Sequence, residues 1–307
     1  MIDISVIVPI YNGEVFIDRC MKSLSIQEEC EFEIIAINDG STDNTKNVLL
    51  TWQKHFGKRL KFVEQDNRGA SAARNRGIEI ASGKYITFLD VDDEYLPGRL
   101  KKYVDFFEAN PDVGVVYSEP ISSSKGREFQ FYQHKKRKTP QGWVYKELLT
   151  CFALTLPTVA FRSELLRKVG GFDESFKVLE DYDLWLRLAL LTPFAYIDEA
   201  LTRINVVPNS LSRVLYRLEV PYYRRTLLEK HKEFIHDKFK FPSLVYRKLY
   251  ADTYFDEGVN ASKLGDHKVE RRLYIKSFAM YPRNLKPLKR LIRSFIVNLS
   301  SIIKCNT

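Results

Sequence analysis

The stretch Ile4-Ser5-Val6-Ile7-Val8-Pro9-Ile10-Tyr11-Asn12 decides the fold class, because a nearly continuous apolar run ends abruptly in a polar turn. Similar β-branched runs predict further strands over 33–37, 61–64, 85–89 and 113–117. Amphipathic segments between them predict helices over 14–25, 44–55, 70–81 and 97–109. This alternation is typical of βαβ units, so the sequence predicts an α/β fold with a mostly parallel sheet flanked by helices. The apolar first strand should be buried on both faces.

The second block of the chain carries a weaker pattern. A strand is expected over 158–161 and a helix over 180–191, while the polar stretch 119–141 predicts a mobile loop or an exposed hairpin. Pro97 is expected at the first position of its helix, where a missing amide hydrogen costs little. After residue 207 the chain becomes helical, basic and rich in aromatic residues.

Composition and charge limit the class of protein. The 307 residues are 45% hydrophobic, which excludes disordered and low-complexity chains. The net charge of +9 divides unevenly, because residues 208–307 contribute +12 and residues 1–207 contribute −3. The cysteines have no metal-ligand spacing, the first strand is not preceded by a signal-peptide pattern, and no apolar stretch reaches the length of a membrane span. We therefore expect a cytoplasmic protein.

Acidic residues follow the predicted strands at their carboxyl ends, where open α/β sheets bind ligands. Asp90, Asp92 and Asp93 form the most informative group. Adjacent carboxylates repel one another unless a cation lies among them, and Mg²⁺ or Mn²⁺ would leave room for water and a substrate phosphate. A solvated acidic turn before the next helix explains the same residues equally well, since the helix dipole favours carboxylates there.

Three other groups allow both a structural and a functional interpretation. The segment 39–43 is consistent with ordinary helix capping, yet Asp39 could accept a hydrogen bond from a nucleotide base. Arg68 and Arg74 lie near a predicted helix start and could contact a diphosphate or a ribose, or could be surface residues. Glu180 and Asp181 suit the first turn of a helix, but a carboxylate facing a pocket could deprotonate an acceptor hydroxyl.

Taken in order, these motifs resemble the inverting glycosyltransferases of family 2, which have the GT-A fold. The resemblance covers residues 3–205 and rests on the segments 6–12, 33–43, 67–75, 90–93, 170–173 and 180–181. It implies a GT-A (Rossmann-like) domain over 1–207, with a nucleotide-binding half over 1–118 and an acceptor half over 119–207. A basic helical C-terminal region over 208–307 would follow.

The resemblance also implies an activity. It is the metal-dependent, inverting transfer of one sugar from a nucleotide-sugar, most often a UDP-sugar, to a hydroxyl of a glycan or lipid-linked glycan, as in bacterial surface polysaccharide synthesis. Asp181, with Glu180 beside it, would be the catalytic base. Asp92 and Asp90 would hold Mn²⁺ or Mg²⁺. The nucleotide-sugar would contact Pro9, Tyr11, Asn12, Asp39, Arg68, Arg74, Asp90, Val91 and Asp93.

Two departures from the family pattern refine this expectation. Asn38 replaces the usual first acidic residue of its motif, which leaves the reading of uracil to Asp39. The segment 202–205 lacks the histidine that many relatives carry, and the Q-x-x-R-W motif of processive synthases is not visible. We therefore expect one sugar addition per acceptor.

The C-terminal segment 284–307 carries an apolar stripe at helical spacing, flanked by lysine and arginine. Such a helix could lie on an anionic membrane, which would make the enzyme peripheral on the inner face of the cell membrane. Packing onto the catalytic domain or within a homodimer is an equal alternative.

Two other classes of protein remain open. A non-catalytic nucleotide-sugar-binding protein is disfavoured because both acidic motifs are intact. A nucleic-acid-binding protein is suggested by the +12 of the C-terminal third. It is disfavoured by the acidic strand ends and by the lack of a recognisable nucleic-acid module, so we expect no nucleic-acid partner.

Overall fold

The computed structural model describes residues 1–307 except 125–126, 131–138, 151–153, 206–210 and 295–307. The chain divides into two compact units, Met1–Pro208 (unit 1) and Asn209–Thr307 (unit 2), which are described separately. Within the described ranges, no helix combines the length and the apolar character needed to cross a membrane.

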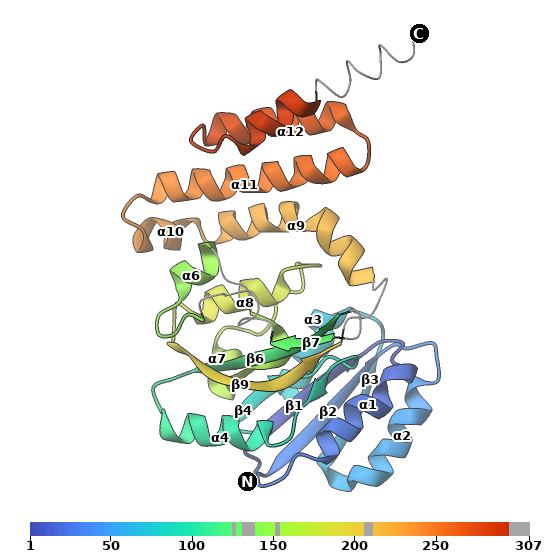
Figure 1. Cartoon of the computed structure of the whole chain (residues 1–307). Coiled ribbons are helices and arrows are strands. Elements are labelled where there is room, and N and C mark those ends of the chain that lie inside the picture. Colours follow the sequence, from blue (N-terminus) through green and yellow to red (C-terminus); the bar gives the residue numbers. More distant parts are fainter. Residues whose placement is uncertain (125–126, 131–138, 151–153, 206–210, 295–307) are drawn as a thin grey trace. The chain divides into compact units, whose positions relative to one another are not determined.

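Four parallel strands form one side of the sheet of unit 1 (Figure 1). They lie in the order β3 (Leu60–Gln65), β2 (Phe32–Asp39), β1 (Ile4–Ile10) and β4 (Tyr85–Phe88). The main helices that follow them in the chain are α1 (Glu14–Ser25), α2 (Thr45–Phe56), α3 (Ala70–Ile80) and α4 (Arg99–Ala109). The apolar run of β1 is buried on both faces, as its sequence predicts.

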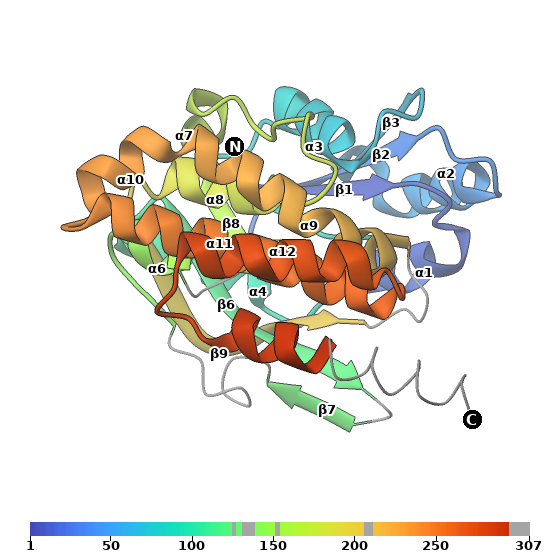
Figure 2. The same ribbon diagram turned by 90° about the horizontal axis from the view of Figure 1, so that it is seen from above.

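Side chains of β1 alternate between two apolar layers. Val6 and Val8 belong to the core that includes buried residues of α1, α2 and α4. Ile7 points to the other face, where α3 approaches so closely that a Cβ on Gly77 would lie 2.4 Å from the Ile7 Cγ2 atom. Figure 2 shows α3 on one side of β1. The missing side chain of Gly77 therefore lets the C-terminal half of α3 pack directly against β1.

Beyond β4 the sheet is mixed. It continues with β8 (Val159–Arg162), β6 (Val115–Ser124), β9 (Phe194–Ile204) and β5 (Glu94–Tyr95), while β7 (Arg127–Gln130) pairs with β6. β6 and β9 are parallel, and the other new pairs are antiparallel. The shorter helices of unit 1 are η1 (Gly57–Arg59), α6 (Tyr145–Thr150), η2 (Leu156–Thr158), α7 (Ser163–Lys168) and α8 (Glu180–Leu188). The predicted fold class is confirmed.

Some predicted boundaries were wrong. The helix expected to start at Pro97 begins at Arg99, because Gly98, with a φ of 75°, turns the chain just before it. The helix expected over 180–191 ends at Leu188. The polar stretch 119–141 contains part of a hairpin formed by β6 and β7, and the remainder of that stretch lies partly outside the described residues. The long strand β9 was not predicted.

Unit 2 is helical. Its helices are α9 (Leu211–Lys230), α10 (Lys232–Lys238), α11 (Pro242–Lys263) and α12 (His267–Met280), and residues 286–294 are helical as well. The Asp266 side chain caps α12 by accepting a hydrogen bond from the Val269 amide. The terminal amphipathic helix predicted within 284–307 is therefore present over 286–294, and residues 295–307 lie outside the described part of the chain.

Candidate active site

The loops after β1 and β2 are joined by hydrogen bonds at the carboxyl edge of the sheet. Asn12 has a φ of 51°, and its Oδ1 atom accepts a hydrogen bond from the Thr42 amide at 2.8 Å. The Asn12 amide donates to the Ser41 hydroxyl at 2.9 Å. Asn12, expected at the nucleotide-sugar, thus lies at the predicted edge and also fixes the neighbouring loop. Tyr11 beside it is 52% exposed and Pro9 is partly buried.

Asp39 ends β2 and is almost fully buried. Its Oδ1 atom accepts hydrogen bonds from the Gln65 side chain at 2.8 Å and the Arg68 amide at 2.9 Å. Its Oδ2 atom accepts from the Gly69 amide at 2.8 Å. A carboxylate offers about four acceptor positions, so these donors occupy most of its capacity. A nucleotide base at Asp39 would have to share the carboxylate with the 68–69 loop.

Arg74 of α3 joins two acidic motifs that are far apart in the sequence. Its Nη2 atom lies 2.9 Å from Asp90 Oδ1, and its Nη1 atom lies 3.0 Å from Glu180 Oε1. Its guanidinium also lies 5.4 Å from the centroid of the Phe172 ring. The Arg74 side chain is only 8% exposed. The structure therefore places Arg74 between the carboxylates rather than on the surface.

The acidic loop, residues 89–93, connects β4 to β5. Asp93 is buried, and its Oδ1 atom accepts a hydrogen bond from the Asn205 amide at 2.9 Å. Burial, together with the charges of Asp90 and Asp92, raises the pKa of Asp93 well above its usual range. Asp93, expected at the sugar, thus binds the residue that directly follows β9. Val91 packs against the apolar core and anchors the loop.

Asp92 has a different environment. Its backbone carbonyl accepts hydrogen bonds from Arg19 Nη2 at 2.6 Å and from the Asn205 side chain at 3.0 Å. Burial and the neighbouring charge of Asp90 raise the pKa of its carboxyl. The backbone of the loop is thus held from two sides while two carboxylates repel each other within it.

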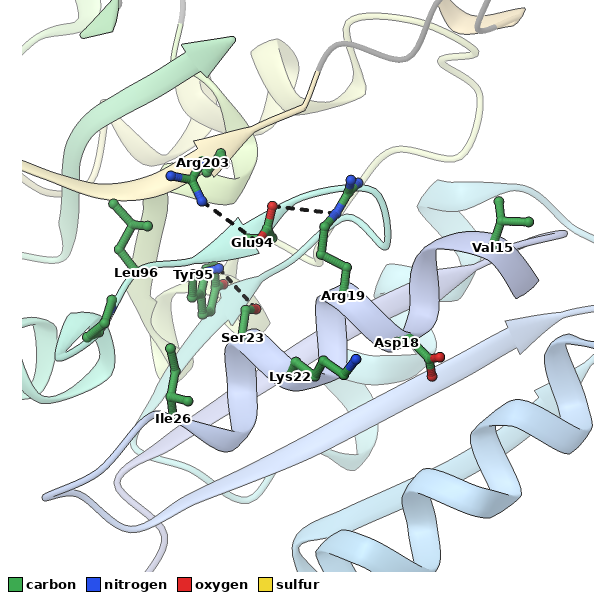
Figure 3. A pocket seen from close by; sticks show the side chains of 11 residues that line it. Val15, Asp18, Arg19, Lys22, Ser23, Ile26, Glu94, Tyr95, Leu96 and Arg203 are labelled. Carbon is green, nitrogen blue, oxygen red and sulfur yellow. Dashed lines mark hydrogen bonds and ion pairs between the residues drawn. The ribbon is translucent and has the colours of Figure 1, made fainter. Parts of the chain in front are cut away.

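A groove of about 570 Å³ lies beside the acidic loop, between α1 and β5 (Figure 3). Glu94 lies at the upper edge of the groove between two arginines. Its Oε1 atom is 3.4 Å from Arg19 Nε, and its Oε2 atom is 3.9 Å from Arg203 Nη1. Figure 3 also shows the Tyr95 amide donating to the Ser23 hydroxyl. These contacts fix β5, the strand that receives the acidic loop, against α1.

The second acidic motif begins α8. Leu179, just before it, has a φ of 66°, an uncommon backbone conformation for a residue with a Cβ. Asp181 is half-buried, and burial together with the charge of Glu180 raises the pKa of its carboxyl to about 7. A carboxyl with this pKa exchanges its proton near neutral pH, as a general base requires.

The loop before α8 is held against α3. The Asn75 side chain accepts a hydrogen bond from the Phe172 amide at 2.8 Å and donates to the Phe172 carbonyl at 2.9 Å. Arg187 donates to the Val169 and Gly171 carbonyls. Arg68, expected at the nucleotide, is mostly exposed and pairs with Glu174 of the same loop at 3.2 Å.

Asp92 and Asp90 are the residues that could hold a divalent cation. Within the described residues, no cluster of three or more His, Cys, Asp or Glu is arranged as a metal site. Mg²⁺ commonly binds through one or two carboxylates plus substrate phosphates. Burial and, after it, the charge of Asp90 raise the pKa of Asp92, and a cation shared by the two carboxylates would relieve their repulsion. The oxygen donors therefore fit Mn²⁺ or Mg²⁺ together with a diphosphate.

The sequence prediction and the structure agree on which motifs meet. Arg74 brings Asp90 and Glu180 together, and Asp181 follows Glu180 in the chain. Asn12 and Asp39 lie at the carboxyl edge of the sheet, where they accept hydrogen bonds from backbone amides of neighbouring loops. Residues that the sequence analysis did not assign are Arg19, Asn75, Phe172 and Asn205. The sequence could have pointed to Asn205, because this residue lies in the segment 202–205, where many relatives of the family carry a histidine.

The mixed sheet flanked by helices, with acidic motifs at its strand ends, has the GT-A fold. The model of the family "Glycosyl transferase family 2" matches residues 5–170, and the chain belongs to this family.

Known proteins resemble this chain in sequence or in fold. An uncharacterized glycosyltransferase of Rickettsia conorii is 30% identical over 203 residues, which are 66% of this chain and 33% of that protein. S. aureus TarS 1–349 in complex with UDP-GlcNAc is 20% identical, with a TM-score of 0.67 over 95% of this chain and 88% of that one. The mannosyltransferase PcManGT from Pyrobaculum calidifontis, in complex with GDP-Man and Mn²⁺, is 19% identical, with a TM-score of 0.58 over 96% of this chain and 86% of that one. The chain spans 33% to 64% of the length of the first curated relatives.

Proposed function

We propose that this protein transfers one sugar from a nucleotide-sugar, favouring a UDP-sugar, to a hydroxyl of a glycan or lipid-linked glycan, with inversion at the anomeric carbon. The observation that carries the proposal is the bridge from Asp90 through Arg74 to Glu180, which brings the donor motif and the proposed base motif into one site. TarS and PcManGT were solved with UDP-GlcNAc and with GDP-Man, which supports a nucleotide-sugar donor.

In this mechanism Asp181 accepts the proton of the acceptor hydroxyl as its oxygen attacks the anomeric carbon. The hydroxyl oxygen forms the new glycosidic bond while the bond to the diphosphate breaks on the opposite face, so one displacement inverts the configuration. The raised pKa of Asp181 makes its carboxylate a stronger base than an exposed aspartate. Glu180, paired with Arg74, holds the first turn of α8 in place.

Asp92 and Asp90 would hold Mn²⁺ or Mg²⁺, which would supply a Lewis acid for the departing diphosphate. Arg74 keeps Asp90 in position through its hydrogen bond at 2.9 Å. Arg19 and Asn205 keep the backbone of the loop in place through the Asp92 carbonyl. Pro9, Tyr11 and Asp39 would face the nucleotide base.

The decisive experiment compares donor binding with turnover in Asp181→Asn. UDP and a panel of UDP-sugars with Mn²⁺ should raise the melting temperature of the wild type and of the variant equally, because the substitution leaves the donor motif intact. Release of UDP from the sugar donor should be lost only in the variant. Asp112→Asn is the matched control, since Asp112 is exposed and precedes β6 at the opposite edge of the sheet.

Other outcomes would contradict parts of the proposal. Retained turnover in Asp181→Asn would move the base to Glu180. Turnover that survives chelation or Asp92→Asn would exclude the metal assignment. Binding of nucleotide-sugars with no turnover in the wild type would favour the non-catalytic binding protein.

We further propose a peripheral location on the cytoplasmic face of the cell membrane through residues 284–307. In the described part of this segment, Leu285 and Ile292 are 54% and 52% exposed, with Lys286, Lys289 and Arg293 exposed near them. Apolar and basic side chains on one short helix are the combination that anionic lipid surfaces attract.

A further inference from the structure

Arg99 is a fully buried cation that has no anionic partner among the described residues. It is the first residue of α4, and none of the interactions recorded for it within the described residues involves a carboxylate. Its Nε atom donates to the Thr202 hydroxyl at 3.1 Å, and its Nη2 atom donates to the Pro157 carbonyl at 2.8 Å. Its Nη1 atom has no hydrogen-bond partner in the described chain. Burying a charge in this way costs several kcal/mol unless other contacts compensate it.

Two tyrosine rings supply part of that compensation. The Arg99 guanidinium carbon lies 3.6 Å from the centroid of the Tyr95 ring and 4.3 Å from that of the Tyr103 ring. Both rings are buried, and cation–π contacts are strongest where water is excluded. The planar guanidinium can stack on rings in a way that an ammonium group cannot.

The same contacts close the base of the acidic loop. The loop leaves the sheet after Phe88 and returns at Glu94, and the Tyr95 hydroxyl donates to the Phe88 carbonyl at 2.8 Å. The Tyr95 hydroxyl also lies 3.0 Å from the Thr87 hydroxyl, to which Arg99 Nη2 donates at 3.0 Å. Thr87 and Tyr95 are thus joined to each other and to one guanidinium.

Arg99 also reaches β9, the strand that directly precedes Asn205. Tyr95 pairs with Thr202 in the sheet, and Arg99 Nε donates to the hydroxyl of that threonine. Three residues further along, Asn205 holds the Asp92 carbonyl and the Asp93 carboxylate. One buried side chain therefore ties together both stems of the loop and the strand that supports its tip.

We infer that Arg99 is a positioning residue that sets the shape of the acidic loop, and thereby the affinity of the site for a divalent cation with a nucleoside diphosphate. It acts through Thr87, Tyr95 and Thr202 and does not touch the ligand. This inference rests on the proposed function, because the affinity it concerns is that of the proposed donor site.

The test uses the full chain and two readouts. Hydrogen exchange of the ligand-free protein reports the stability of residues 88–95, and calorimetry with UDP and Mn²⁺ reports the site. Arg99→Lys keeps the charge and removes the planar fork, while Tyr95→Phe keeps the ring and removes the hydroxyl that closes the loop. Tyr103→Phe is the matched control, because Tyr103 also stacks on Arg99 but its hydroxyl bonds Ser118 and the Thr158 carbonyl.

Arg99→Lys and Tyr95→Phe should exchange faster over 88–95 than elsewhere and should bind UDP with Mn²⁺ about tenfold more weakly, the effect of one lost hydrogen bond. Tyr103→Phe should bind within about threefold of the wild type. Wild-type exchange and affinity in both test variants would overturn the inference, and so would an equal loss in Tyr103→Phe. If Arg99→Lys does not fold, the two tyrosine variants decide. A wild type that binds no nucleotide would instead contradict the proposed function, and the exchange comparison would still decide the inference.

Discussion

Replacing Arg74 by methionine should destabilise unit 1 by about 2–4 kcal/mol at neutral pH. Arg74 is 8% exposed, and its partners Asp90 and Glu180 are 33% and 20% exposed. Removing one partner of a fully buried ion pair costs about 3–5 kcal/mol, because a charge is left without compensation. The partial exposure of both carboxylates lets water reach them, which reduces the expected loss to about 2–4 kcal/mol.

Tryptophan fluorescence during urea unfolding of the full chain measures this loss. The three tryptophans are Trp52, Trp143 and Trp185, and all belong to unit 1, so their signal reports that unit alone. With a dependence on urea of about 2 kcal/mol per molar, the midpoint should fall by about 1–2 M.

The pH dependence of the destabilisation in Arg74→Met shows whether it comes from the lost positive charge or from lost side-chain packing. Arg74 opposes the rise in the pKa of Asp181, so without Arg74 this pKa should lie still further above its unfolded value. The destabilisation is then complete above the folded pKa of Asp181, decreases as the pH falls and disappears below the unfolded value near about pH 4.

Arg76→Met is the control, because Arg76 lies on the same helix and is 50% exposed beside Glu79. Its loss should stay within about 0.5 kcal/mol. The reasoning is refuted if Arg74→Met costs no more than Arg76→Met. A loss in Arg74→Met that does not change with pH would point to the contact with Phe172 instead.

Three further predictions concern acid stability, catalysis and membrane binding. Burial would raise the pKa of Glu33, but hydrogen bonds from Lys61, Ser5 and Ser82 lower it from 4.5 to about 2. The Glu33 carboxylate therefore stabilises the fold above pH 4.5, and this stabilisation is lost as the pH falls towards 2. Glu33→Gln should lower the free energy of unfolding by about 3 kcal/mol at neutral pH. The acid limb of the curve, where the free energy of unfolding falls between pH 4.5 and 2, should be flatter in the variant than in the wild type. An unchanged acid limb would contradict this. The kcat/KM for transfer should fall tenfold for each pH unit below about pH 7, where Asp181 becomes protonated. Glu180→Gln should move the pH at which this fall begins to a lower value, because the charge of Glu180 raises the pKa of Asp181. A kcat/KM that does not change from pH 5 to 8 would exclude Asp181 as the base. Deleting residues 284–307, or changing Leu285 and Ile292 to serine, should release the protein from sedimenting anionic vesicles, and unchanged partitioning would favour the packing alternative.

The first half of unit 1 could be predicted because its strands are short apolar runs between amphipathic helices. β1 is two residues longer than predicted and β2 is three residues longer, since the sheet's hydrogen bonds continue into the polar motif. β9 was missed because it contains Asp198 and Glu199 in its middle and pairs with β6 across register shifts near Glu119, which hides any regular alternation.

The site was predictable as a set of motifs but not as a set of contacts. Arg74 was expected at the nucleotide, and its partners lie 16 and 106 residues away in the chain. A helix pattern offered one clue, because Arg74 shares its face with Ile78, four residues later, and both are buried. Asp39 and Asp93 likewise bind backbone amides that only the folded chain brings near them.

The position of Asp181 shows which physical effect dominates in the site. A helix N-terminus stabilises a carboxylate by about 0.3–1 kcal/mol and lowers its pKa. The pKa of Asp181 is nevertheless raised from 3.8 to about 7 by burial and by Glu180, a difference of about 4 kcal/mol. Burial therefore outweighs the helix dipole in setting the pKa of Asp181. The left-handed backbone turn at Leu179 lies directly before Glu180 and Asp181 in the chain. Backbone strain of this kind persists only where the surrounding structure enforces it, so Leu179→Gly should relax the turn and lower the rate of transfer without weakening the binding of the donor.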